Sequence, residues 1–285
     1  MEQVPAVRRR RLGEELRRLR DLAGLTSGEA AGLAGWHQSK VSRIETGRSS
    51  VRAEDVTVLL DVYGVRDRDL RDLLGTLAGK GHQRGWWHEF REVLPVEYRD
   101  FINLETGASR ARSMENSVVP GLLQTPAYAH ALTRDVMPHL GRREVDALVD
   151  VRIARQAVLR QDRPLELWVV LDEAVLRRGV GGPEVMAEQL RCLEEAARLP
   201  QIRLQVLPFT AGGHMGVTNS FIIFSFPRIA DLDVVVVDHL TSSVYIDRKE
   251  DITAYGTAFA RLRARALPCE ESAAMIAGIR AEMSL

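Results

Sequence analysis

Residues 16–48 constrain the fold of this chain more than any other stretch, because their apolar, glycine and capping residues fit three short helices joined by tight turns. Apolar side chains recur at spacings of three and four ahead of Gly24. This spacing predicts a first helix over residues 12–23, closed by Gly24 in the left-handed conformation. Thr26 and Glu29 have the spacing of a capping box and predict the start of a second helix. The stretch therefore predicts a compact helical unit.

A third helix is predicted to start at His37 or Gln38 and to end at Gly47. At 100° per residue, Val41 and Ile44 fall on the side that packs inward, and polar residues gather on the other side. That polar side carries Gln38, Ser39, Ser42, Arg43 and Thr46. A short surface rich in hydrogen-bond donors and acceptors suits base edges and phosphates, and the alternative is an ordinary amphipathic surface helix.

Two further amphipathic segments, residues 52–63 and 67–77, complete a predicted all-α domain of five helices over residues 12–78. The glycine-rich, polar residues 79–85 are typical of a linker. Residues 1–52 hold eleven Lys and Arg against six Asp and Glu, in a chain whose net charge is zero. This local excess of positive charge fits a nucleic-acid contact near the N-terminus.

The domain carries three patterns that resemble a known family. They are Leu-Arg-x-Leu-Arg in the first helix, Gly24-Leu25-Thr26 at the first turn and Val41-Ser42-Arg43-Ile44-Glu45-x-Gly47 in the third helix. Through them, residues 12–77 resemble a Cro/C1-type helix-turn-helix domain of the XRE family. The resemblance implies a DNA-binding transcription regulator with the second helix across the DNA backbone and the third helix in the major groove.

The resemblance also implies roles for single residues. The residues expected to read bases are Gln38, Ser39, Ser42 and Arg43. The residues expected at the DNA backbone are Thr26, Ser27, Lys40 and Arg48. Arg10 and Arg11, next to this motif, are expected there as well, and the alternative is that their basic arm is solvated and makes no DNA contact. In the family, a carboxylate of the third helix pairs with an arginine of the first, so Arg20 and Glu45 are expected to form a structural ion pair. Two positions depart from the family, with Ser27 where Gln is frequent and His37 where Ser or Thr caps the third helix.

Residues 86–285 have a different composition and are predicted to form a larger α+β domain. The aromatic segment at its start predicts helices on either side of Leu94-Pro95. Strands are predicted near residues 109–117, 165–171, 202–207, 221–226, 234–237 and 244–247, and helices near 126–137, 142–160, 183–198, 248–266 and 270–282. The strands after residue 202 follow one another too closely for helical crossovers, which favours an antiparallel or mixed sheet.

This domain carries a second set of recognisable patterns. They are Val119-Pro120-Gly121-Leu122-Leu123-Gln124-Thr125-x-x-Tyr128, Arg152-x-x-Arg155-Gln156 and Leu207-Pro208-Phe209. With them, nearly all of residues 86–275 resembles the C-terminal domain of actinobacterial WhiJ-like regulators. The resemblance implies a transcription factor that is often encoded beside a small partner protein, and it implies no settled enzymatic activity.

A hydrolase or transferase is the alternative for this domain. His214 lies in a glycine-rich segment, and Asp172-Glu173 follows a predicted strand with Arg177-Arg178 close behind. The simpler interpretation makes His214 a loop residue and the two acids a helix N-terminus. The other histidines lack metal-ligand spacing, and there is no phosphate-binding loop or dinucleotide fingerprint, so we expect no metal and no cofactor.

The remaining expectations concern partners and compartment. Gly121 and residues 211–216 are candidates to border a small-molecule pocket, although a protein partner is favoured over a ligand and both over catalysis. One helix-turn-helix domain reads one half-site, so a homodimer on double-stranded operator DNA is expected. The chain has two cysteines and shows neither a leader peptide nor an apolar run of membrane-spanning length, which predicts a cytoplasmic protein without a membrane contact.

Overall fold

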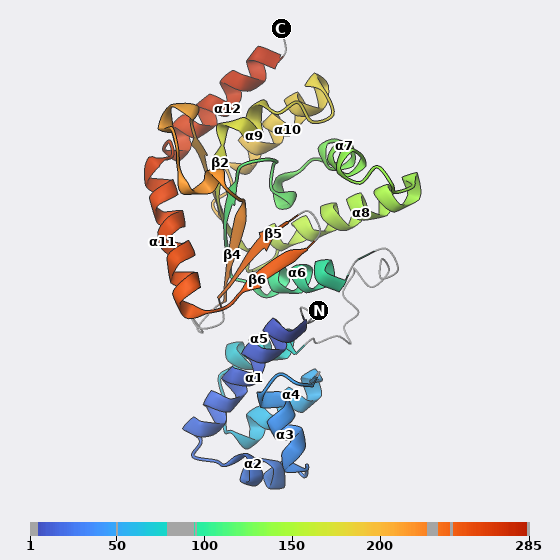
Figure 1. Cartoon of the computed structure of the whole chain (residues 1–285), viewed down its shortest axis with the longest axis vertical. Coiled ribbons are helices and arrows are strands. Elements are labelled where there is room, and N and C mark those ends of the chain that lie inside the picture. The colour runs from blue at the N-terminus through green and yellow to red at the C-terminus, as the bar shows by residue number, and fades with distance from the viewer. Residues whose placement is uncertain are drawn as a thin grey trace. The chain divides into compact units, whose positions relative to one another are not determined.

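The computed structural model describes residues 5–49, 51–78, 94, 96–226, 233–239 and 242–283. These residues form two compact units (Figure 1). Within the described residues, the first contains helices but no strand and runs to Gly107, and the second comprises Leu94 and the chain from Ala108 onward. An all-helical region followed by a larger α+β domain is the fold class predicted from the sequence.

The first unit contains the five predicted helices and one more. They are α1 (Pro5–Leu22), α2 (Ser27–Leu33), α3 (Gln38–Glu45), α4 (Ala53–Val62), α5 (Arg68–Leu77) and α6 (Val96–Gly107). The prediction placed α6 with the second domain, whereas in the structure it belongs to the first unit and packs against α5. The predicted linker at residues 79–85 and the helix expected before Leu94 lie outside the described residues.

The first helix is longer than predicted. It begins at Pro5 instead of residue 12, so the arginine run expected as an arm continues the helix. Proline suits the first turn of a helix, because the amide it lacks has no partner there in any case. The C-terminal end agrees with the prediction: Gly24 has a φ of +71° and follows α1 in the left-handed region.

Gly13 sets the distance between α1 and the end of α3. A Cβ atom added at Gly13 would lie 2.5 Å from the carbonyl oxygen of Glu45 and 2.6 Å from that of Ile44. Neither backbone oxygen can move without displacing α3. The absence of a side chain at this position therefore permits the helix contact that orients α3.

Replacing Gly13 with alanine is expected to lower the free energy of unfolding of this unit by about 1–3 kcal/mol, the usual cost of overpacking. Urea unfolding followed by far-UV circular dichroism measures it. Gly32→Ala is the matched control, because Gly32 also lies in a helix but a Cβ there meets nothing within 4 Å. The control is expected to be neutral or slightly stabilising. Equal stability of the two variants would contradict the close contact at Gly13.

The second unit is built on one mixed sheet of six strands. The strands are β1 (Arg110–Glu115), β2 (Glu166–Asp172), β3 (Ile202–Leu207), β4 (Phe221–Ser225), β5 (Val234–Asp238) and β6 (Ser243–Ile246). Their order is β3-β2-β1-β4-β5-β6, with β1, β2 and β3 parallel and with β4, β5 and β6 added antiparallel. The last three strands, which follow one another closely in sequence, pair antiparallel as expected.

Helices surround this sheet (Figure 1). They are α7 (Pro126–Val136), α8 (Arg142–Arg155), α9 (Glu173–Arg177), α10 (Pro183–Ala196), α11 (Lys249–Arg265) and α12 (Cys269–Met283). Phe259 and Leu262 of α11 are buried in an apolar cluster with strand residues such as Val170 and Ile223. The α12 helix contacts both α10 and β3. The segment predicted as one helix over 142–160 leaves the α conformation at Arg155 and ends in a 3₁₀ turn, Gln156–Leu159.

Candidate nucleic-acid interface

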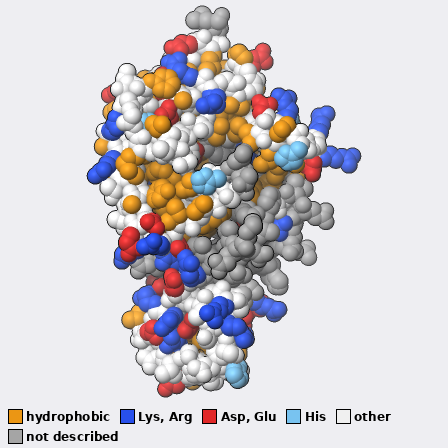
Figure 2. All heavy atoms as spheres, viewed as in Figure 1, with side chains coloured by type: hydrophobic (Ala, Val, Ile, Leu, Met, Phe, Trp, Pro, Cys, Tyr) orange, Lys and Arg blue, Asp and Glu red, His pale blue; other side chains and the backbone are white. Residues whose placement is uncertain are grey.

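The polar face of α3 is exposed, as its periodicity predicts. Val41 and Ile44 are buried against the other helices of the unit. Four side chains on the opposite face are exposed, namely Gln38, Ser39, Ser42 and Arg43. The structure therefore presents the predicted base-reading residues together on one surface. Figure 2 shows that basic and acidic side chains are interspersed on the visible face of this unit.

The beginnings of α2 and α3 are held together by polar side chains. The amide of Gln38 donates a hydrogen bond to the hydroxyl of Ser27 across 3.0 Å. His37 caps α3, since its side chain accepts from the backbone N–H of Ser39 and its Nδ1 lies 3.1 Å from the Ser39 hydroxyl. The histidine thus performs the capping that Ser or Thr performs in the family it resembles. These contacts fix the relative position of the two helix starts.

Thr26 and Glu29 form the predicted capping box at the start of α2. The Thr26 hydroxyl accepts from the backbone N–H of Glu29, and the Glu29 carboxylate accepts from the backbone N–H of Thr26 across 2.8 Å. Hydrogen bonds from the Thr26 backbone N–H and hydroxyl to the carboxylate lower the pKa of Glu29. Because the Thr26 hydroxyl also donates to Glu29, its contact with a phosphate would compete with the cap.

Arg43 on α3 and Arg48 just after this helix carry exposed guanidiniums. Both side chains are exposed, and no described residue forms a hydrogen bond or an ion pair with either guanidinium. An unengaged arginine needs no rearrangement before it binds a phosphate or the two acceptors of guanine.

Lys40, predicted at the DNA backbone, forms an ion pair within the unit. Its Nζ lies 2.7 Å from a carboxylate oxygen of Asp55 on α4. The same ammonium lies 3.6 Å from the ring centroid of Trp36. These contacts connect the start of α3 to α4. Sequence spacing does not reveal them, because Asp55 lies fifteen residues away.

Arg10 and Arg11, also predicted at the DNA backbone, lie beside an acidic residue of their own helix. Both lie in α1 and face Glu14, with nitrogen-to-oxygen distances of 3.9 Å for Arg10 and 3.2 Å for Arg11. Spacings of three and four residues bring side chains together on one helix face. The expected basic arm is therefore helical, and Glu14 pairs with its last two arginines.

Arg20 of α1 and Glu45, the last residue of α3, form a buried bidentate ion pair. The two nitrogen-to-oxygen distances are 2.8 and 3.1 Å, and both side chains are less than a tenth exposed. Tyr63, predicted only as an apolar core residue, also donates its hydroxyl to Glu45 across 3.2 Å. Hydrogen bonding to Glu45 raises the pKa of Arg20, and burial raises the pKa of Tyr63. This network connects α1, α3 and the end of α4.

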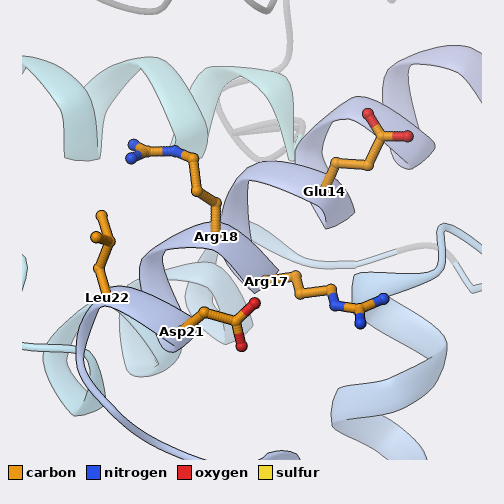
Figure 3. Close-up of a pocket in the computed structure, with 5 residues that line it drawn as sticks. All are labelled: Glu14, Arg17, Arg18, Asp21 and Leu22. Atoms are coloured by element: carbon orange, nitrogen blue, oxygen red, sulfur yellow. The ribbon is translucent and has the colours of Figure 1, made fainter.

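A shallow depression lies on α1 (Figure 3). It is lined by Glu14, Arg17, Arg18, Asp21 and Leu22. Glu14 pairs with Arg11, Asp21 pairs with Arg20, and Leu22 is exposed on the surface. The depression offers no convergent set of polar groups for a small molecule.

In the second unit, the residues proposed for an enzyme do lie together. His214 Nε2 lies 3.0 Å from a carboxylate oxygen of Asp172, and Glu173 accepts from the backbone N–H of Phe209 across 2.9 Å. Glu173 also pairs with Arg177, whereas Arg178 donates to the backbone oxygen of Ser117. The His214 side chain is only 5% exposed, and its Nδ1 is buried without a partner among the described residues. These contacts fasten the β3–β4 connection to β2 and α9.

Models of known families match two parts of the chain. Residues 11–74 match a helix-turn-helix domain, which indicates DNA binding and transcription regulation. Residues 98–278 match a domain of unknown function, DUF5753. The chain belongs to the DUF5753 family. No curated protein and no solved structure matches it.

The Val-Pro-Gly-Leu-Leu-Gln-Thr pattern of the DUF5753 domain is a buried hydrogen-bonded turn. Gln124 donates to the backbone oxygen of Val119, and Gln189 of α10 both accepts from the Thr125 N–H and donates to the Leu123 oxygen. A Cβ added at Gly121 would make an ordinary van der Waals contact, 3.6 Å from the Arg155 guanidinium. The pattern thus packs η2 (Gly121–Leu123) against α8 and α10.

Among the described residues, no group of His, Cys, Asp and Glu is arranged to hold a metal ion. In the same part of the chain, no helix has the length and apolar character needed to cross a membrane. Glu115, at the end of β1, is buried and was not anticipated, because strand alternation alone does not distinguish it from a surface acid.

Burial raises the pKa of Glu115 to about 7, although hydrogen bonds from Ser113 and Ser220 oppose the shift. An unfolded glutamate has a pKa of about 4.3, so between that value and 7 the folded state keeps a proton that the unfolded state has lost. The stabilisation from the neutral carboxyl is therefore complete at low pH and is lost as the pH rises toward 7.

Glu115→Gln is expected to remove this loss, which is roughly 1 kcal/mol for each pH unit between about 4.5 and 7. Urea unfolding at several pH values, compared between the variant and the original chain, measures the difference. Replacement of the exposed Glu184 by Gln is the matched control and should leave the slope unchanged. Identical pH dependence in the Glu115 variant and the original chain would contradict the raised pKa.

Proposed function

We propose that this protein is a sequence-specific transcription regulator of the XRE, Cro/C1 type, acting in the cytoplasm on double-stranded operator DNA. The observation that carries the proposal is the exposed face of α3, where Gln38, Ser42 and the unengaged Arg43 lie together. With α3 in the major groove, these side chains read base edges, and α2 lies across the backbone. Ser27 and Arg48 then contact phosphates, and Lys40 does so by exchanging Asp55 for a phosphate.

Selection from a library of random duplex DNA tests sequence recognition directly. The full chain is expected to enrich one short motif, and its affinity for the motif should exceed its affinity for unrelated DNA by at least about a thousandfold at matched salt. Enrichment of no motif, or equal affinity for both DNAs, would contradict the proposal.

We infer that the DUF5753 unit, with its WhiJ-like resemblance, supports dimerisation and senses a protein partner or a ligand. Two domains on one operator would read half-sites about 10 base pairs apart, which adds specificity that a single short helix does not supply. Sedimentation velocity with and without the selected DNA tests this part. A dimer on DNA is expected, and a monomer under both conditions would contradict it.

Catalysis is not part of this proposal. The Asp172–His214 pair resembles part of a hydrolytic site, but the histidine is nearly inaccessible and its second ring nitrogen is buried. A general base must reach the proton that it removes from a substrate. We therefore assign these residues to the attachment of the β3–β4 connection.

A further inference from the structure

Trp168 of β2 lies among three arginine side chains of the second unit. The guanidinium carbons of Arg110 and Arg203 each lie 4.8 Å from its ring centroid, and that of Arg263 lies 4.4 Å away. All three distances are within the range of a cation–π interaction. Three separate elements thus bring positive charge to one aromatic ring.

The sheet register explains this convergence. Trp168 lies directly opposite Arg203 in the parallel β2–β3 pair, and Arg110 on β1 lies opposite Glu166, two residues before the tryptophan. Residues two apart on a strand share a face of the sheet. Arg263 comes from α11, which packs on this sheet (Figure 1). Its Nε donates to Gln205 of β3 across 3.2 Å, which fixes the direction of the side chain.

The positive charge of this cluster is only partly neutralised. Arg110 pairs with Glu166 across 2.8 Å. No carboxylate of the described residues forms an ion pair with Arg203 or Arg263, and the Arg263 guanidinium has Gln205 as its hydrogen-bond acceptor. The neighbouring Arg112 differs, because it has Asp233 at 3.5 Å. Two uncompensated guanidiniums therefore remain beside the same ring, close enough to repel each other at physiological salt.

The surroundings allow a ligand to reach these groups. Arg203 is exposed, the Arg110 side chain is 42% exposed, and Trp168 and Arg263 are only partly buried. Three guanidiniums beside one ring repel one another. An anion bound beside the exposed Arg203 would relieve that repulsion. Guanidiniums also present paired donors that match phosphate oxygens.

We infer that Arg110, Trp168, Arg203 and Arg263 form a binding site for the phosphate group of a small phosphorylated ligand. Arg203 and Arg263 supply the charge, Trp168 orients them, and Arg110 contributes a further donor from its pair with Glu166. A phosphorylated ligand would be the signal for the sensing role proposed above, and only this regulatory role of the site rests on that proposal. Binding itself is independent of DNA.

Isothermal titration calorimetry of the full chain with inorganic pyrophosphate, in low-chloride buffer without DNA, tests the site. Saturable binding of one pyrophosphate per chain is expected. Arg203→Gln and Arg263→Gln should each weaken it by about tenfold or more, because each removes a charge-assisted contact. Arg203→Lys should retain part of the affinity, since it keeps the charge but loses the planar fork.

Arg261→Gln is the matched control. It removes the same charge from the same helix, and Arg261 is exposed outside the cluster. Unchanged affinity in this variant supports the site, whereas an equal loss would show general charge attraction and overturn it. Absence of saturable pyrophosphate binding would also overturn the site. So would an Arg203→Gln variant that binds DNA more weakly but pyrophosphate as tightly as the original chain. If the chain selects no DNA motif, the proposed function fails, whereas the pyrophosphate titration still tests the binding site.

Discussion

Replacing Arg43 with alanine is expected to weaken binding to the selected DNA motif by about 1–3 kcal/mol, or roughly 5- to 150-fold. Arg43 is exposed on α3 and has no competing partner among the described residues, so the loss reports the DNA contact and not a broken internal bond. Fluorescence anisotropy with the selected duplex, at one fixed salt concentration, measures the change.

Arg66→Ala is the matched control for this experiment. Arg66 is exposed between α4 and α5, away from α3, so its removal changes the net charge equally. Its effect is expected to be small and independent of sequence. If Arg43 reads a base, its loss also relaxes the preference at one position of the motif. Equal effects of the two variants, or unchanged affinity for Arg43→Ala, would remove Arg43 from the reading surface.

Local signals in the sequence sufficed for most of the helical unit. Apolar spacing located α1 to α5, and the Thr26–Glu29 pair and Gly24 marked two of their ends, because each of these signals acts within a single turn. The start of α1 at Pro5 was missed. The run Arg8 to Arg11 lacks an apolar stripe, so the periodicity did not predict a helix at these residues. The helix continues through them because they are joined to its packed part.

Contacts between distant residues were harder to predict. The family resemblance identified the Arg20–Glu45 pair, but nothing in the spacing indicated that Asp55 would engage Lys40 or that Tyr63 would bond to Glu45. Both contacts depend on the crossing of α4 with the other helices. Tertiary packing therefore decides which polar residues near α3 remain available to DNA.

The second unit shows the same division. Its strands were predicted from β-branched runs, and their close succession indicated the antiparallel half of the sheet. The strand order was not available, because it is set by pairing across the chain. Consequently the sequence did not predict that Arg110, Arg203 and Arg263 converge on Trp168, because these residues lie up to 153 positions apart.

Replacing Glu45 with alanine is expected to lower the free energy of unfolding of the helical unit by about 3–5 kcal/mol, the usual cost of breaking a buried ion pair. The change leaves the Arg20 guanidinium buried without its main counter-charge and deprives the Tyr63 hydroxyl of its acceptor. Because domains are stable by only about 5–15 kcal/mol, α1 and α3 should open measurably. Hydrogen exchange of their amides in the full chain detects this opening.

Two further variants separate the buried pair from surface charge. Asp61→Ala breaks the pair between Arg71 and Asp61, in which the carboxylate is 64% exposed, and should cost no more than about 1 kcal/mol. Combining Arg20→Met with Glu45→Leu removes both buried charges and should recover much of the stability lost in Glu45→Ala. If the double variant is no more stable than Glu45→Ala, the loss comes from packing around Glu45. In that case the unpaired charge of Arg20 is not its cause.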